Sequence, residues 1–328
     1  MHYVVGDVHG CFDDLMAMIE TIEKRDNDAT IIFVGDFIDR GPKVWETLNW
    51  CRRNITVDGK YQSVLGNHED LVMQCYYEYR NSREKVITKI PPLYYGFDRI
   101  LFENGIENIE EIAPIVGFFE TMPLYKKIDV TMVSGKMQTY YIAHAYIPKD
   151  GPKPDDYDNP KRRREYLWSR QHIWGYQGDG ILIHGHTTTL DNDYILRGPV
   201  KSGFIAYRPN AINIDGGCAY LQMDYTSGPC MLCAICLETL EEIYPYPWED
   251  RMSMVDYDLN RHSEFGMEKE EFHKYLTNVW INKIKEKNKI FEGAVVAERL
   301  DMLVKTGLLA ENEMVGNVLR SKCIFPTQ

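Results

Sequence analysis

The sequence predicts an α/β fold that opens with parallel strands. Three short apolar segments, residues 2–5, 30–34 and 61–65, have the length and composition of buried strands. Apolar residues recur at helical spacing in the segments that follow them, which are residues 12–22, 44–54 and 69–80. Regular alternation of strand and helix is typical of a parallel βαβαβα arrangement. The first 80 residues therefore predict one half of an α/β domain.

The middle of the chain predicts a helical insertion and a return to strands. Residues 81–123 have a helical and aromatic pattern with turn signals at Pro91-Pro92 and Gly105, and residues 128–133 and 139–143 resemble strands. Residues 149–165, rich in Pro, Asp and Arg, predict an exposed loop. Its run from Lys161 to Arg164 is either a solvated, charge-balanced segment or a dock for an acidic or phosphorylated partner.

The character of the chain changes after residue 247. Residues 268–289 and 294–304 are charged and helical, and Phe272, Leu276 and Val279 form part of an apolar stripe on the first of these helices. We divide the chain into a catalytic domain, residues 1–247, and a helical C-terminal extension, residues 248–328. The stripe can pack against the catalytic domain, a second copy of the chain or another protein, and the sequence leaves these open.

Each of the first three predicted strands is followed by a polar motif. The motifs are Gly6-Asp7-Val8-His9-Gly10, Gly35-Asp36-Phe37-Ile38-Asp39-Arg40-Gly41 and Gly66-Asn67-His68-Glu69. Because the carboxyl ends of parallel strands meet at one edge of a sheet, we expect the three motifs to form one site. The flanking glycines let the backbone turn sharply at the strand end and leave room for metal and substrate.

The motifs contain the ligands that two neighbouring divalent cations require. Such a pair is bound by hard oxygen and imidazole ligands, and one carboxylate bridges the two ions. Asp7, His9, Asp36 and Asn67 supply that set. A shared metal site explains three such motifs in this order better than three ordinary Gly-Asp turns do.

The motifs resemble the signature of the metal-dependent phosphoprotein phosphatase family, within the calcineurin-like metallophosphoesterases. The likeness is closest to its compact phage and bacterial members, extends to about Pro245, and includes Tyr141-Ile142-Ala143-His144-Ala145 and Gly185-His186-Thr187. The resemblance implies a mixed β-sheet sandwich flanked by helices. It also implies that His144 and His186 complete the ligand set of the second metal.

His184 is an alternative to His186 on spacing alone. Residues two apart in a strand lie on the same side, so alternation does not separate the two histidines. The family pattern, Gly-His followed by a small polar residue, favours His186.

The resemblance implies hydrolysis of phosphate monoesters by direct attack of a hydroxide that bridges the two cations. It assigns His68 as the general acid for the leaving oxygen, with Asp39 orienting the imidazolium. Arg40 and Arg170 would hold phosphate oxygens through their guanidinium groups. These residues also have non-catalytic explanations. Asp39 and Arg40 could form an ion pair at the surface, and Arg170 could have a structural role. The expected cofactors are two divalent metal ions, manganese first, with iron, zinc or another transition metal as alternatives.

Three functions are compatible with these residues. The first is a phosphoserine or phosphothreonine protein phosphatase, with phosphotyrosine left open, whose partner is a phosphorylated protein or peptide. The second is a symmetrical dinucleoside tetraphosphatase, but similar sequences there usually lack the aspartate found here as Asp39 and end the third motif in Asp rather than Glu69. The third is a scaffold without metals, which the retention of all six ligands argues against. Residues 188–210, beside His186, are a candidate specificity loop.

Composition excludes several other classes. With 44% hydrophobic and 26% charged residues among 328, the chain has the composition of a soluble globular protein. The net charge of −12 disfavours general nucleic-acid binding. No apolar stretch approaches 18 residues and no charged-then-apolar leader precedes Gly6, so we expect a cytoplasmic protein without a membrane partner.

Three of the eight cysteines have the spacing of a metal or cluster site. Cys230, Cys233 and Cys236 could bind zinc or an iron–sulfur cluster. They lie in an apolar run that predicts a strand, in which residues three apart point to opposite faces. We therefore predict buried free thiols.

Overall fold

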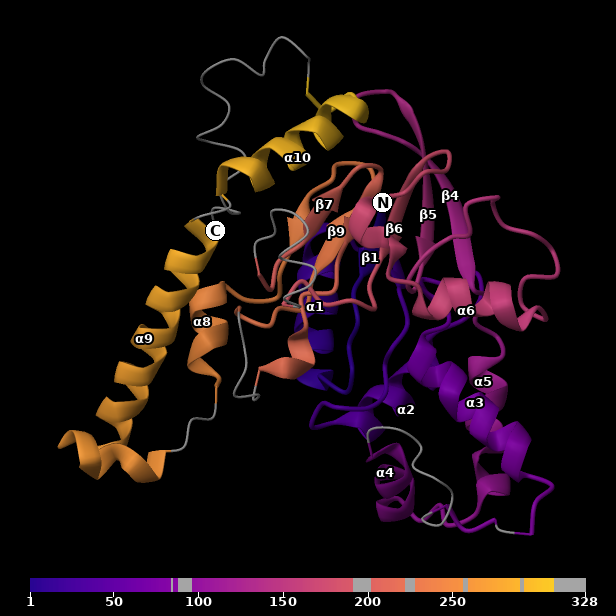
Figure 1. Cartoon of the computed structure of the whole chain (residues 1–328), viewed down its shortest axis with the longest axis horizontal. Helices are drawn as coiled ribbons and strands as arrows, with labels where there is room; N and C mark the ends of the chain where they lie inside the picture. The colour runs from indigo at the N-terminus through magenta and orange to yellow at the C-terminus, as the bar shows by residue number, and fades with distance from the viewer. Residues whose placement is uncertain are drawn as a thin grey trace.

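The described part of the chain contains two five-stranded sheets that pack face to face (Figure 1). The computed structural model describes residues 1–83, 85–87, 96–190, 202–221, 228–255, 259–289 and 292–309. Helices flank the two sheets, as the resemblance implied. No helix within these ranges is long and apolar enough to cross a membrane. The cytoplasmic location stays a prediction.

The first sheet carries the three motifs. Its strand order is β10-β9-β1-β2-β3, in which the last three strands are parallel and the first two pair antiparallel. The three predicted opening strands are confirmed, two of them ending one or two residues early. The strands are β1 (His2–Val5), β2 (Thr30–Phe33), β3 (Tyr61–Ser63), β9 (Ala234–Cys236) and β10 (Glu242–Ile243).

The second sheet supplies the other half of the sandwich. Its order is β4-β5-β6-β8-β7, with β5, β6 and β8 parallel and antiparallel strands at both edges. Residues 191–201, inside the predicted specificity loop, lie outside the described residues. The strands are β4 (Tyr125–Thr131), β5 (Met137–Ala143), β6 (Ile181–His184), β7 (Ala206–Arg208) and β8 (Ala211–Asn213).

Strand alternation divides the core into two layers. Val4 and Ile32 belong to the cluster between the sheets, where they are buried with Ile142 and other residues of the second sheet. Their neighbours in sequence point the other way, and Phe33 packs in the cluster beneath the helices. The helices on this face include α1 (Phe12–Arg25) and α2 (Val44–Asn54), as the apolar spacing predicted.

The predicted helical insertion is confirmed for its described part. Residues 84 and 88–95 lie outside the described residues, and the remainder packs against α3 through buried apolar side chains such as Ile112 and Phe119. Helix α3 spans Asn67–Tyr79. The described helices of the insertion are α4 (Phe97–Glu103), the 3-10 turn η3 (Ile109–Ile112) and α5 (Ala113–Phe119).

The prediction of a loop over residues 149–165 is wrong from Pro160 onward, because α6 (Pro160–Trp168) begins at that residue. The Asn159 side chain accepts hydrogen bonds from the backbone N–H groups of Lys161 and Arg162 and so caps the helix. Pro160 occupies the first helical position, where its fixed φ and missing N–H are tolerated. The sequence pair Asn-Pro therefore starts a helix here, within a segment whose Pro, Asp and Arg content predicted a loop.

The C-terminal helices contact the sandwich. Arg208 of β7 forms an ion pair of 2.9 Å with Glu298 of α10, and Ile284 and Met302 are buried in the cluster between the sheets. Figure 1 shows these helices on the side of the sandwich away from α3, α4 and α5. The boundary after residue 247 stays a prediction, as does any partner of the extension. The elements are α8 (Trp248–Ser253), η6 (Leu259–Phe265), α9 (Lys269–Lys289) and α10 (Glu292–Lys305).

The three closely spaced cysteines form no shared metal site within the described part of the chain. Cys230, Cys233 and Cys236 are all buried and free, as predicted. Strand β9 spans Ala234 to Cys236 and is shorter than the apolar run. Of the three cysteines, only Cys236 therefore lies in the strand. Burial raises the pKa of the Cys233 thiol well above its usual value, which keeps it protonated.

Candidate functional site

Both sheets place polar residues at the same end of the sandwich. The motif residues follow the carboxyl ends of β1, β2 and β3, and the two distal histidines follow β5 and β6 of the other sheet. The six residues predicted from the sequence and the resemblance are Asp7, His9, Asp36, Asn67, His144 and His186, of which all but His186 are nearly inaccessible to solvent.

Five residues of this site have left-handed backbone conformations. Their φ values are 43° at His9, 54° at Asp36, 69° at Asp39, 67° at Arg40 and 68° at His186. Residues other than glycine rarely adopt the left-handed region of backbone conformation, because their β-carbon crowds the backbone. Such strain clusters at functional sites, where the surrounding structure holds it in place.

The Asp36 carboxylate lies between two imidazoles. Its Oδ2 atom is 3.4 Å from Nε2 of His9 and 3.4 Å from Nε2 of His144. The opposite ring nitrogens, both Nδ1, donate to the carbonyls of Ile38 at 2.7 Å and Val34 at 2.9 Å. Both Nε2 atoms therefore lie close to one carboxylate oxygen. This donor set fits a cation on each side of Asp36.

Asn67 and Asp7 complete the donor set beside the second sheet. The Asn67 Oδ1 atom is 2.6 Å from Nε2 of His144 and 3.0 Å from Nδ1 of His186. Asp7 Oδ2 accepts the backbone N–H of His186 at 3.1 Å, whereas its buried Oδ1 has no hydrogen-bond partner among the described residues. An unsatisfied buried carboxylate oxygen is the kind of atom that a cation would satisfy. The six residues fit two divalent cations.

Burial and charge set protonation states that suit metal binding. Burial lowers the pKa values of His9, His144 and His186, so their imidazoles are neutral. Burial alone would raise the pKa of Asp36, but electrostatic interactions with the surrounding His144, His68, His9 and Arg40 side chains more than offset burial and hold this pKa far below its usual value. Neutral imidazoles and an ionised carboxylate are the forms that bind metals.

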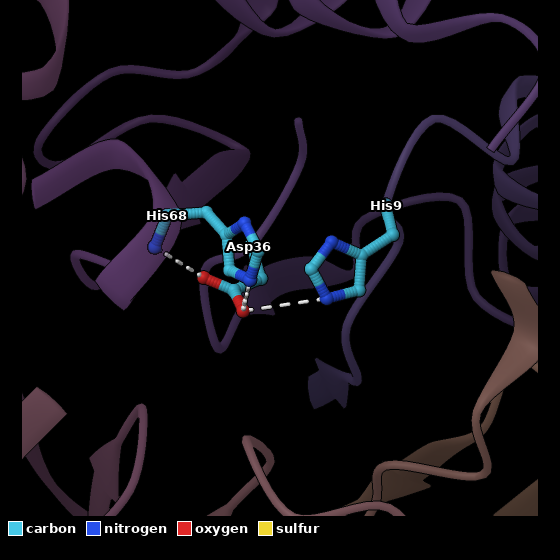
Figure 2. Close-up of side chains that lie close together, drawn as sticks. All are labelled: His9, Asp36 and His68. Atoms are coloured by element: carbon cyan, nitrogen blue, oxygen red, sulfur yellow. Dashed lines mark hydrogen bonds and ion pairs between the residues drawn. The ribbon is translucent and has the colours of Figure 1, made fainter. Parts of the chain in front are cut away.

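His68 differs from these three histidines. Its Nδ1 atom is 2.5 Å from Oδ2 of Asp39, and its Nε2 is 3.8 Å from Oδ2 of Asp36 (Figure 2). Burial opposes protonation, but Asp36 and then Asp39 raise the pKa of His68 above its usual value. His68 could also be grouped with His9 and Asp36 as a metal ligand. Asp39 engages Nδ1, so Nε2 is the ring nitrogen that faces Asp36 and the Arg40 guanidinium, 3.1 Å away, and a proton carried on Nε2 would face the site.

The two arginines lie at the edge of the site. The Arg40 guanidinium donates to His9 Nε2 at 2.5 Å and lies over the Tyr220 ring, 5.3 Å from its centroid. Arg170 is exposed. Burial is the main cause of the lowered pKa of His186, and the charge of Arg170 adds a smaller contribution to it. Both guanidinium groups are therefore close enough to influence the site, and their phosphate-binding roles stay predictions.

Sequence reasoning missed Asp215. It follows β8 in the segment from Asn213 to Gly217, and its buried Oδ1 accepts the Gly217 backbone N–H at 2.9 Å. Burial raises the pKa of Asp215 to about 6, and Asp215 in turn raises the pKa of Asp7. Asp215 follows an apolar strand, as Asp7 does, so a strand-end carboxylate was visible in the sequence, although the two glycines that follow Asp215 have no counterpart directly after Asp7.

The structure separates His184 from His186. The His186 ring approaches Asn67, whereas Nδ1 of His184 donates to the Gly185 carbonyl at 3.1 Å inside the core. Strand β6 ends at His184, and His186 has a left-handed φ. Alternation therefore does not extend to His186, which is why spacing could not decide between them.

Residues 3–212 match the model of the calcineurin-like phosphoesterase family. The chain belongs to this family. Its members are metal-dependent phosphoesterases, so hydrolase chemistry on a phosphoester and a requirement for divalent metal follow from membership. The family also accounts for the mixed two-sheet sandwich and for the position of the site at the carboxyl ends of its strands.

Individual relatives have different extents of similarity. An asymmetrical bis(5'-nucleosyl)-tetraphosphatase, PrpE of Halalkalibacterium halodurans, is 28% identical over 244 residues, which cover 66% of this chain and 85% of that protein. A symmetrical bis(5'-nucleosyl)-tetraphosphatase of Neisseria gonorrhoeae is 43% identical over 68 residues, and the chain spans only 24% of its length. The solved structure of a metallophosphoesterase from Sphaerobacter thermophilus is 15% identical, covers 82% of this chain and 95% of that chain, and has a TM-score of 0.44.

Proposed function

We propose that this phosphoesterase is a phosphatase of the phosphoprotein phosphatase type that hydrolyses phosphoserine and phosphothreonine. The buried pair of His68 and Asp39 carries the proposal. A serine or threonine alkoxide is a strongly basic leaving group, so its departure needs a proton donor. The 2.5 Å contact orients the imidazole, and the raised pKa of His68 makes it a suitable donor.

The remaining residues would bind and orient the phosphate. Arg40, which directly follows Asp39 and lies close to His9 and His68, would hold two non-bridging oxygens through its planar fork of donors. Arg170 would contact a third oxygen from the exposed side. The Arg40 guanidinium lies over the ring of Tyr220, and this contact would limit the movement of the guanidinium.

The six-residue donor set would hold two divalent cations, for which manganese is our proposal. His9 and Asp7 would bind one ion, Asn67, His144 and His186 the other, and Asp36 would bridge them. When bound, such a pair supplies a nucleophilic water of lowered pKa and neutralises charge on the phosphate. The left-handed backbone at Asp36 and His186 would help to hold these donors in place before substrate arrives.

A bis(5'-nucleosyl)-tetraphosphatase is the second candidate function. It is favoured by the Halalkalibacterium halodurans relative, because the similarity covers most of that protein. The leaving group in such a reaction is a phosphate anion, which is a weak base and needs little protonation. The buried His68 and Asp39 pair would then be less important than it is for an alkyl ester.

A substrate panel separates the two functions. The metal-loaded protein is supplied with phosphoserine, phosphothreonine and phosphotyrosine peptides, diadenosine tetraphosphate and nitrophenyl phosphate at matched concentrations. We expect kcat/KM for the phosphoserine and phosphothreonine peptides to exceed that for the dinucleotide. A protein that cleaves the dinucleotide and none of the phosphopeptides contradicts the proposal. A phosphorylated protein as partner and a cytoplasmic location remain part of the same proposal.

A further inference from the structure

A groove of about 840 Å³ lies between α3 and α6. Met73 and Tyr77 of α3, Tyr157 before α6, and Lys161, Arg164 and Trp168 of α6 are among the residues that line it. The Trp168 ring packs edge-on against the ring of His186, with 5.9 Å between the centroids. The groove therefore adjoins the site at its His186 side and could hold a part of the substrate beyond the scissile phosphate.

The four basic residues of α6, Lys161 to Arg164, lie on different faces of the helix. Two of them, Arg162 and Arg163, are already paired with acidic side chains. Arg162 forms ion pairs with Asp150, at 2.7 Å, and with Asp156. Arg163 donates to the buried Asp70 of α3, at 2.8 Å through its Nε. These two arginines hold α6 to its surroundings, so their charges are largely neutralised within the protein.

The other two basic residues face the groove. Lys161 and Arg164 are three residues apart, so they lie on the same side of the helix. Both are exposed, and neither side chain has a hydrogen bond or ion pair with any residue in the described ranges. Two uncommitted positive charges beside the site are unusual in a chain with a net charge of −12.

Most of the acidic side chains that line the groove are engaged. Asp70 is paired with Arg163, and Glu120 accepts a hydrogen bond from the Tyr77 hydroxyl. Asp158 is the acid of this lining for which the described residues provide no side-chain partner. An anion entering the groove would therefore meet two available cations and one available acid.

The tyrosines offer limited space for stacking a nucleobase. The Arg163 guanidinium covers one face of Tyr157 at 4.1 Å, and the Arg80 guanidinium covers one face of Tyr77 at 4.7 Å. Recognition in the groove therefore depends mainly on its available cations and its apolar rim. This chemistry suits an extended peptide with an acidic side chain better than a stacked base.

We propose that the groove is a peptide subsite, in which Lys161 and Arg164 select an acidic side chain next to the phosphorylated residue. The inference rests on the proposed phosphoprotein phosphatase function and adds a substrate preference to it. The two contacts are exposed, so each contributes only modestly to binding. Together they should favour a glutamate over a lysine in the substrate by about fivefold or more in kcat/KM, less at high salt.

The test uses matched phosphoserine peptides that carry glutamate, alanine or lysine at the positions flanking the phosphoserine. The full chain should prefer the glutamate peptide, and the double variant Lys161→Glu and Arg164→Glu should prefer the lysine peptide. Nitrophenyl phosphate, which is too small to reach the groove, should be hydrolysed at an unchanged rate. The control variant is Arg52→Glu with Arg53→Glu, two exposed arginines in the last turn of α2, which should keep the parental preference.

The outcomes separate the subsite from the proposed function. If all three phosphopeptides are hydrolysed equally well, or if the charge reversal leaves their order unchanged, the subsite is wrong and the phosphatase function stands. If only diadenosine tetraphosphate is hydrolysed, the function is wrong and the peptide subsite is overturned with it. A charge reversal that selectively slows the dinucleotide would then assign the groove to a nucleotide.

Discussion

The Glu69 carboxylate holds the backbone of Asp36. Its Oε2 accepts the Asp36 N–H at 2.9 Å, and its Oε1 accepts the N–H of Phe37 at 2.8 Å. Glu69 is completely buried, and Asp36 has a left-handed φ of 54°. The contact thus fixes a strained turn at the carboxylate on which both halves of the donor set converge.

Replacing Glu69 should weaken both the fold and metal binding. Glu69→Ala removes the acceptor of the buried backbone N–H groups of Asp36, Phe37 and Ile38, which we expect to lower the free energy of unfolding by about 3 kcal/mol. Glu69→Gln keeps one acceptor and should be intermediate. Urea unfolding in a chelator measures the first effect, and manganese titration measures the second. Glu20→Ala, at an exposed position of α1, is the control. Parental metal affinity in Glu69→Ala would show that the contact does not position Asp36.

His68→Asn should affect substrates according to their leaving groups. The variant lacks the proton donor, so hydrolysis of phosphoserine peptides should slow far more than hydrolysis of nitrophenyl phosphate, whose leaving group needs little protonation. Elemental analysis should find the same metal content as in the parent. Equal slowing of both substrates, with metal retained, would argue for a structural role of His68.

Arg40 and Arg170 should affect different kinetic constants. Arg40 contacts His9 and His68, so Arg40→Ala should mainly lower kcat. Arg170 is exposed, so Arg170→Ala should mainly raise KM and weaken inhibition by inorganic phosphate. Each loss should be about 2 kcal/mol, or about thirtyfold in kcat/KM. Arg170 does not belong to the site if Arg170→Ala binds phosphate and turns over normally.

Helix α8 should be required for an intact site, although it follows the predicted domain boundary. The buried Arg251 forms a 2.9 Å ion pair with Asp14 and donates to the carbonyls of Cys218, at 3.2 Å, and Cys230, at 3.3 Å. Cys218 begins the turn that ends at Tyr220, beside Arg40.

A chain that ends at residue 247 should therefore lose stability and phosphatase activity. A chain that ends at residue 255, which retains α8, should keep more of both. Arg251→Met should cost about 3 kcal/mol or more, because it leaves Asp14 buried and unpaired. Thermal unfolding and nitrophenyl phosphate turnover measure both effects. Full activity of the chain ending at residue 247 would show that α8 does not support the site.

Local patterns in the sequence predicted the opening strands, the helices between them and the first four donors. These features depend on neighbours in the chain, so periodicity and strand-end motifs contain the information. His144 and His186 come from the second sheet. No local pattern shows that its strand ends meet those of the first sheet, and the resemblance supplied that relationship.

The features that sequence reasoning missed depend on tertiary contacts or on competing local signals. Asp215 follows an apolar strand, as Asp7 does, but it was not weighed. The start of α6 at Asn159-Pro160 was hidden among charged residues that favour a loop. Arg251 has no motif at all, because its partners come from distant parts of the chain.

Metal content tests the central claim of a two-cation site bridged by Asp36 most directly. The chain is stripped with a chelator, titrated with manganese and compared with Asp36→Asn and Cys233→Ser by elemental analysis and phosphatase assay. We expect two ions in the parent and in Cys233→Ser, and loss of both metal and activity in Asp36→Asn, because the imidazoles of His9 and His144 both lie close to its Oδ2. Two ions and full activity in Asp36→Asn, or metal loss only in Cys233→Ser, would contradict the assignment.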